Sequence, residues 1–191
     1  MLTPIDPLGV AQLVAGLLEQ SGLRYVIGGS VASSLMGEPR STLDLDLMIE
    51  SDPVKVRILV PLLSEICHVD EENALDAVER RTSFNAVHFD SSMKIDFFIV
   101  DSALSQEQLL RARRLPLSSG VSLYFYTPED LIVRKLLWFR LGGETSQRQW
   151  RDVLGILRTS RNEIDRALLV DTAVKAEVSD LLERALREVS E

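Results

Sequence analysis

Residues 27–49 read IGGSVASSLMGEPRSTLDLDLMI, and this stretch decides how the whole chain is interpreted. A Gly-Gly-Ser turn opens a helix of small residues, and a strand with two aspartates follows. Residues two apart in a strand share a face, so Asp44 and Asp46 point one way while the leucines beside them point into a core. Two such carboxylates repel each other unless a cation compensates them, and oxygen ligands suit Mg²⁺.

A second strand repeats this pattern further along the chain. In the run KIDFFI, Asp96 shares a face with Lys94, and the apolar residues line the other face. The segments 83–89 and 93–100 are separated by a short turn-forming link, which predicts an antiparallel hairpin. An isolated Asp-x-Asp strand is commonly a solvated sheet edge. If the hairpin lies beside the first strand, however, three carboxylates converge, which is enough to hold two Mg²⁺ ions.

The composition is that of an ordinary globular protein. The chain has 191 residues, of which 46% are hydrophobic and 26% charged, and its net charge is -8. Its one cysteine, Cys67, excludes an intramolecular disulfide and favours a cytoplasmic location. No apolar run reaches the roughly 20 residues of a membrane span. Residues 111–161 carry ten Lys or Arg and four Asp or Glu, a balance of +6 that fits either a polyanion or a solvated helix surface.

The order of expected elements predicts an α/β (α+β) fold with a mixed sheet flanked by helices and a C-terminal helical part. The segments expected to form strands are 24–27, 43–49, 83–89, 93–100 and 121–126. Those expected to be helical are 7–21, 31–36, 53–66, 106–114 and 131–141, followed by helices only from 146 onward with breaks near 159–160 and 169–170. Residues 70–81 are polar and show no clear pattern.

The quoted stretch resembles the signature of the DNA polymerase β superfamily of nucleotidyltransferases, in which a Gly-Gly or Gly-Ser turn opens a helix and an Asp-x-Asp strand follows. The resemblance covers residues 24–155 and is closest to a small prokaryotic branch. That branch includes toxin-type enzymes of abortive-infection and toxin–antitoxin systems, and aminoglycoside or lincosamide nucleotidyltransferases. It implies a nucleotidyltransferase core over residues 1–126 and a helical region over 127–191 packed on that core.

The resemblance also implies roles for individual residues. The residues expected to bind the nucleotide are Gly28, Gly29, Ser30, Arg40 and Lys135. The residues expected to bind two Mg²⁺ ions and to carry the catalysis are Asp44, Asp46 and Asp96. Asp96 would in addition accept the proton of the attacking hydroxyl. Whether Lys135 or the adjacent Arg134 contacts the triphosphate stays open.

These features predict a Mg²⁺-dependent enzyme that moves a nucleoside monophosphate from an NTP to an acceptor hydroxyl. Three acceptors are weighed: an RNA such as the 3′ end of a tRNA, a small hydroxylated molecule, and a protein side chain. In the first case the protein would be the toxin of a toxin–antitoxin system, with an antitoxin as partner; in the second it would be an antibiotic-modifying enzyme. The alternative from another class is a non-catalytic module that binds a partner protein.

Weaker features have ordinary explanations. Cys67 and His68 are adjacent and therefore diverge in direction, so we expect a core cysteine and a surface histidine. His88 reads as a half-exposed strand residue and only a minor catalytic candidate.

Overall fold

The computed structural model describes residues 6–39, 41–118 and 120–190, and the chain divides into two compact units. The first comprises Met1–Val31 and Ser41–Phe125, and the second Ala32–Arg40 and Tyr126–Glu191. Arg40 lies outside the described residues, so its predicted phosphate contact remains a prediction.

Seven strands and nine helices make up the described part of the chain. The strands are β1 (Arg24–Ile27), β2 (Asp44–Glu50), β3 (Cys67–Val69), β4 (Ser83–His88), β5 (Lys94–Ile99), β6 (Arg113–Pro116) and β7 (Ser122–Phe125). The helices are α1 (Pro7–Gln20), α2 (Gly29–Met36), α3 (Pro53–Leu63), α4 (Glu71–Arg80), α5 (Ala103–Leu110), α6 (Pro128–Leu141), α7 (Gln147–Thr159), α8 (Arg166–Lys175) and α9 (Ser179–Ser190). This confirms the predicted mixed α/β class.

The first unit is built on one mixed sheet with strand order β3-β4-β5-β2-β1-β7-β6. The predicted hairpin of β4 and β5 is antiparallel, and β5 pairs with β2 in parallel. Alternation places the apolar residues of β2 and β5 on one face, where Leu45, Leu47, Ile95 and Phe97 are fully buried. Their neighbours along each strand therefore lie on the opposite, polar face.

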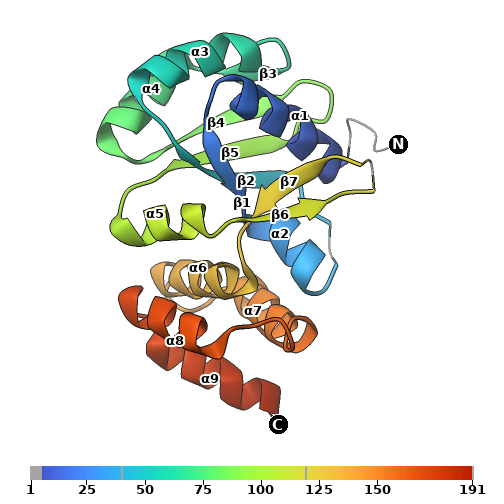
Figure 1. Ribbon diagram of the computed structural model, residues 1–191, viewed down its shortest axis with the longest axis vertical. Helices are drawn as coiled ribbons and strands as arrows, with labels where there is room; N and C mark the ends of the chain where they lie inside the picture. Colours follow the sequence, from blue (N-terminus) through green and yellow to red (C-terminus); the bar gives the residue numbers. More distant parts are fainter. Residues whose placement is uncertain (1–5, 40, 119, 191) are drawn as a thin grey trace. The chain divides into compact units, whose positions relative to one another are not determined.

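Helices cover the two faces unequally. Figure 1 shows α1, α3 and α4 on one side of the sheet and α5 on the other. The hydroxyl of Tyr25, which shares the apolar face, donates a hydrogen bond to Glu19 of α1. On the polar face, Gln106 of α5 donates to Glu50 at the far end of β2. The end of β2 that begins at Asp44 is thus the end of the polar face away from α5.

Three elements differ from the expectation. Residues 70–81 contain a helix, α4, because Asp70 caps its first turn through the amide of Asn73 and a narrow stripe of alanine and valine is enough to bury one side. The strand β3 covers residues 67–69, for which the sequence predicts neither a helix nor a strand. Residues 113–116 form the edge strand β6 instead of the end of a helix, since their pairing with β7 outweighs a weak helical pattern.

The second unit consists of the helices that follow β7, together with residues 32–40, which include most of α2. The predicted cap of α6 is confirmed, because the hydroxyl of Thr127 accepts a hydrogen bond from the amide of Asp130. The expected break near 169–170 is wrong: α8 runs through it and ends at Lys175. No helix within the described residues is both long and apolar enough to cross a bilayer.

Candidate active site

Three aspartates meet on the polar face of the sheet. The parallel pairing of β2 with β5 places Asp46 directly opposite Asp96, and Asp44 opposite Lys94. All three carboxylates are half-buried. Strands in a sheet are about 4.8 Å apart, so partners in register on one face are immediate neighbours. The convergence expected from the sequence is therefore present in the strand register.

Lys94 is the cation that these carboxylates share. Its ammonium group lies 2.7 Å from one oxygen of Asp96 and 3.0 Å from the other. The hydrogen bond to Asp96, together with the charges of Asp96, Asp44 and Asp46, raises the pKa of Lys94 above its ordinary value. One lysine thus offsets part of the repulsion among three acids.

The three aspartates provide the oxygen ligands that a hard divalent cation prefers, but their side chains do not surround a common point. In residues 6–39, 41–118 and 120–190, no three carboxylate, imidazole or thiolate groups form a cluster that could hold a metal ion. Asp96 is turned toward Lys94 instead. The donor set is nevertheless all oxygen, lies on adjacent positions of one face and already attracts a common cation, which is the chemistry that Mg²⁺ requires.

The Gly-Gly turn is built directly against Asp46. The amide of Gly28 donates a 2.9 Å hydrogen bond to the backbone carbonyl of Asp46. Gly29 has φ +54°, and a Cβ at this position would lie 1.6 Å from Oδ2 and 2.8 Å from Cβ of Asp46. Only glycine fits such an approach. The turn therefore fixes both the backbone and the side chain of one carboxylate.

Ser30 follows this turn within the first turn of α2 and is buried, with 2% of its surface exposed. Backbone amides at a helix start are oriented to bind an anion. Gly28 and Gly29 thus contact Asp46, and Ser30 follows them at the start of α2. That these three residues bind a phosphate stays a prediction.

Lys135 occupies a different environment, in the second unit. Its ammonium group lies 2.7 Å from the carboxylate of Asp152 on α7, and both side chains are almost fully buried, at 4% and 7% exposure. The guanidinium of Arg134, half-buried, lies 5.9 Å from the ring centroid of Tyr126. The role of either residue toward a triphosphate stays a prediction.

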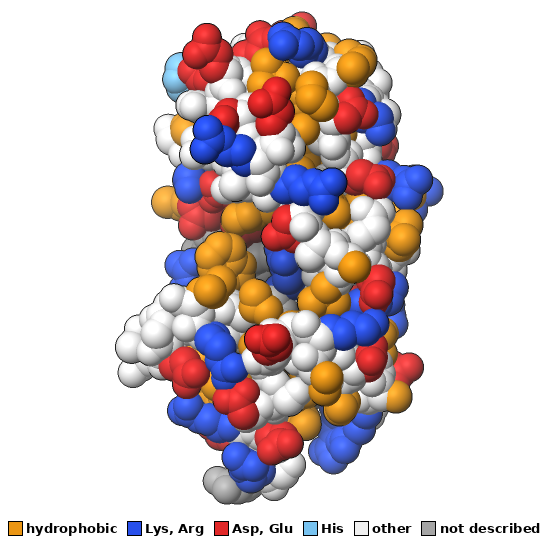
Figure 2. Space-filling view, turned by 90° about the vertical axis from the view of Figure 1, so that its left-hand side faces the viewer, with side chains coloured by type: hydrophobic (Ala, Val, Ile, Leu, Met, Phe, Trp, Pro, Cys, Tyr) orange, Lys and Arg blue, Asp and Glu red, His pale blue; other side chains and the backbone are white. Residues whose placement is uncertain are grey.

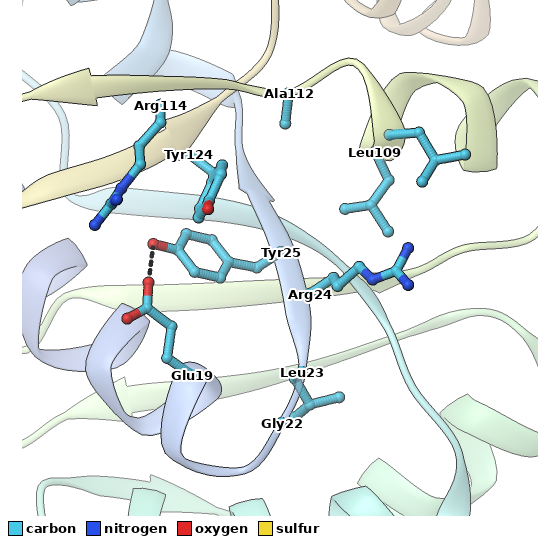
Figure 3. Close-up of a pocket in the computed structure, with 10 residues that line it drawn as sticks. Glu19, Gly22, Leu23, Arg24, Tyr25, Leu109, Ala112, Arg114 and Tyr124 are labelled. Atoms are coloured by element: carbon cyan, nitrogen blue, oxygen red, sulfur yellow. Dashed lines mark hydrogen bonds between the residues drawn. The ribbon is translucent and has the colours of Figure 1, made fainter.

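A surface pocket of about 550 Å³ lies at the opposite end of β1 from the Gly-Gly turn. Figure 3 shows Tyr25 and Tyr124 inside it, with Arg24 and Arg114 at its sides. The two tyrosine rings meet edge to face, with centroids 5.6 Å apart. Because Arg24 begins β1 and the turn follows its last residue, this pocket is separate from the carboxylates.

Sequence reasoning missed two participants and misplaced a third residue. It noted that Lys94 shares the face of Asp96, but not that it is the common counter-ion, and it did not single out Asp152 at all. His88 is buried at 2% exposure, not half-exposed, and its Nδ1 lies 2.8 Å from the hydroxyl of Ser91. His88 alternates onto the apolar face of β4 and is therefore removed from the aspartates. The predictions for Cys67 and His68, core and surface respectively, are confirmed.

Known structures share this fold. An antigenic nucleotidyltransferase-like protein from Paracoccidioides brasiliensis matches 94% of this chain and 91% of its own, with 18% identity and a TM-score of 0.57. The ANT(2'')-Ia protein in complex with adenylyl-2''-tobramycin matches 87% of this chain and 97% of its own, with 14% identity and a TM-score of 0.59. A nucleotidyltransferase structure from Thermotoga maritima matches 75% and 91%, with 16% identity and a TM-score of 0.51.

At these identities the similarity concerns the fold. No curated protein matches the sequence. A family model, by contrast, matches residues 9–183, which include the turn, all three aspartates and most of the helical unit. On this match the chain belongs to the DUF2204 family, described as nucleotidyl transferases of unknown function.

Proposed function

We propose that the chain is a Mg²⁺-dependent nucleotidyltransferase that transfers a nucleoside monophosphate from an NTP to an acceptor hydroxyl. The observation that carries the proposal is the contact between Gly29 and Asp46, because it joins a phosphate-binding turn to a carboxylate that faces Asp96 in register. A nucleotide held by the turn would place its phosphates beside these acids. Family membership and the shared fold agree with this chemistry.

In this proposal each group has one task. The amides of Gly29 and Ser30 bind the phosphates that become pyrophosphate, and the hydroxyl of Ser30 assists them. Asp44, Asp46 and Asp96 would hold the Mg²⁺ ions, which supply charge neutralisation at the phosphates and acidify the attacking hydroxyl. Asp96 accepts the proton of that hydroxyl.

The reaction balances without any further reactant. A bond forms between the acceptor oxygen and the α-phosphorus, and the bond from the α-phosphorus to the bridging oxygen of the β-phosphate breaks. Pyrophosphate leaves with that electron pair, and the hydroxyl proton passes to Asp96. The turn thus acts on the leaving phosphates and Asp96 on the attacking hydroxyl.

A non-catalytic module remains the second candidate, because one observation favours it. Three facing carboxylates by themselves would argue for a retained metal site, but Lys94 already compensates part of their charge. An inert descendant could therefore keep the aspartates and the lysine as a structural ion cluster. The two candidates differ in whether Mg²⁺ and NTP bind together.

The test is incubation with each of the four α-³²P-labelled NTPs and Mg²⁺, offering total tRNA, an aminoglycoside and the protein itself as acceptors. Asp46→Asn removes one carboxylate charge at the site, and Asp171→Asn removes the same charge from the exposed i,i+4 pair with Lys175 in α8. We expect transfer by the wild type and by Asp171→Asn, and none by Asp46→Asn. Full activity in Asp46→Asn would overturn the assignment of the site, and a lack of any NTP binding would favour the inert module.

A further inference from the structure

A second surface pocket, of about 390 Å³, lies on the β4 side of the aspartates, away from the Gly-Gly turn. It lies at the β3 edge of the sheet and is lined by residues of β3, α4 and β4. Its polar lining includes His68, Asp70, Asn73, Asp76, Ser83 and Asn85. The volume is within the range of small-molecule sites, roughly 300–1,000 Å³.

The register of the sheet connects this pocket to the candidate base. Asn85 of β4 is the antiparallel partner of Asp96, and Asp96 is the parallel partner of Asp46. Asn85, Asp96 and Asp46 therefore form one row across the polar face, with adjacent members about one strand spacing apart. Gly29 contacts the Asp46 end of the row, and the pocket opens at the Asn85 end.

This order matches what a displacement at phosphorus requires. The attacking oxygen and the leaving pyrophosphate must lie on opposite sides of the α-phosphorus. If the turn holds the leaving phosphates, the acceptor must approach from the far side of the carboxylates, next to Asp96. The pocket begins on that side, at Asn85, which is the strand partner of Asp96.

The charge of the lining selects among acceptors. Two carboxylates line the pocket, Asp70 and Asp76, and its lining includes no lysine or arginine. Asp76 also pairs with Arg80 at 2.7 Å, whereas Asp70 caps α4 through the amide of Asn73. Binding of RNA depends on cations that neutralise phosphates. A pocket lined by acids, hydroxyls and amides instead suits an acceptor with ammonium and hydroxyl groups.

The basic stretch 111–161 offers little compensation for a nucleic acid. Within it, Lys135 is buried against Asp152, and Arg140 pairs with both Glu144 and Asp180. Figure 2 shows acidic and basic side chains intermingled on the face it presents, rather than one continuous basic area. Asp152 and Glu144 are already counted in the balance of +6, whereas Asp180 lies outside the stretch and offsets one further positive charge.

We propose that the pocket between α4 and β4 is the acceptor site, and that the acceptor is a small polyhydroxylated amine. The inference rests on the proposed function, since it assigns Asp96 as the base that the acceptor meets. A hydroxyl of the bound amine lies toward Asp96, and the ammonium groups lie toward Asp70 and Asp76.

The test measures binding directly, without nucleotide. Tobramycin serves as the cationic probe and a neutral trisaccharide as its uncharged counterpart, both titrated by calorimetry. Asp70→Asn removes the charge but preserves the cap, because asparagine caps helices as well as aspartate does. Asn73→Lys adds an opposing cation to the pocket, and Asp171→Asn is the matched charge change in α8.

We expect wild-type protein to bind tobramycin and not the trisaccharide. Asp70→Asn should weaken the affinity about two- to fivefold, the effect of one exposed charge pair, and Asn73→Lys by at least as much. The affinity for Mg²⁺ and NTP should not change in either variant. Two results of the titration would overturn the inference: Asp171→Asn weakens tobramycin binding as much as Asp70→Asn does, or the trisaccharide binds as tightly as tobramycin. Transfer of label to tRNA alone in the labelling assay described above would overturn it as well.

The two proposals fail in different ways. If tobramycin does not bind while Mg²⁺ and NTP still bind and label is transferred elsewhere, the acceptor assignment is wrong and the proposed function stands. If tobramycin binds but no nucleotide does, the pocket is a binding site and the enzyme assignment is wrong.

Discussion

Replacing Gly29 with alanine should disable the site while leaving the protein folded. The added Cβ would lie 1.6 Å from Oδ2, 2.5 Å from Cγ and 2.8 Å from Cβ of Asp46, whereas real Cβ contacts stay beyond 3.0 Å. The carboxylate oxygen must therefore retreat by at least 1.4 Å. Rotation of the Asp46 side chain cannot relieve the whole clash, because its Cβ does not move with χ1, so the backbone of β2 or of the turn must shift as well.

The expected cost has two parts. Alanine at φ +54° pays about 1–2 kcal/mol for the left-handed conformation, and forcing an extra methyl group into a filled space adds about 1–3 kcal/mol. We therefore expect the free energy of unfolding to fall by about 2–5 kcal/mol. Because a displacement of about 1 Å at a reacting centre can reduce a rate 100-fold, nucleotidyl transfer should fall by about that factor or more.

Gly22 provides the matched control. It also has positive φ, at +67°, but a Cβ there would meet no atom within 4 Å. Gly22→Ala therefore carries only the conformational cost, about 1–2 kcal/mol, and should transfer nucleotide at the wild-type rate. The difference between the two variants, measured by urea unfolding, is the cost of displacing Asp46.

A double variant completes the test. Asp46→Gly removes the atoms that the new methyl group meets, so adding Gly29→Ala in that background should cost no more than Gly22→Ala. If Gly29→Ala instead matches Gly22→Ala in the wild-type background and retains the transfer rate, then Gly29 does not position Asp46 and the argument for the site fails.

Three other changes have defined outcomes. Lys94→Gln should tighten Mg²⁺ binding about two- to fivefold by calorimetry, because it removes a competing cation 2.7 Å from a carboxylate, while Lys175→Gln on an exposed pair should have no effect. Burial raises the pKa of Cys67 from 9.0 to about 11, so the folded state holds the thiol proton more tightly than the unfolded state. The free energy of unfolding should therefore fall by at most about 3 kcal/mol as the pH rises from 9 to 11. In urea unfolding, Cys67→Ala should lack that loss. Lys135→Met should lower the free energy of unfolding by about 3–5 kcal/mol, because it leaves Asp152 buried without its cation. Adding Asp152→Leu should restore most of this loss. A loss below about 1 kcal/mol for Lys135→Met in urea unfolding, as for an exposed ion pair, would contradict the burial of the pair.

The sequence could predict the strands that carry the aspartates because their pattern is local. Alternation along β2 and β5 fixes which residues are buried, and the predicted core positions Leu45 and Phe97 are fully buried. The caps of α3 and α6 were also readable, because Asp52 and Thr127 each precede a proline at the first helical position.

The misses concern contacts that no local pattern contains. The strand β6 exists because β7 pairs with it, and it has no strong period of its own. Helix α4 is the exception: Ala74, Ala77 and Val78 recur at helical spacing among charged residues, a local pattern made inconspicuous by the small size of the buried side chains. The partnership of Lys135 with Asp152 spans two helices and 17 residues. The role of Lys94 depends on the parallel register that brings β2 beside β5, which the sequence could suggest only as a condition.

The residues that line the proposed acceptor pocket all fall between His68 and Val87, one continuous stretch of chain. The turn and the Asp-x-Asp strand come from residues 28–46, which is a separate stretch. On the two proposals, acceptor choice and transfer chemistry would be encoded in different segments of the chain. Changes in β3 and α4 would then redirect the protein to another acceptor without altering a group proposed to handle phosphate, and relatives that share the aspartates would diverge in what they modify.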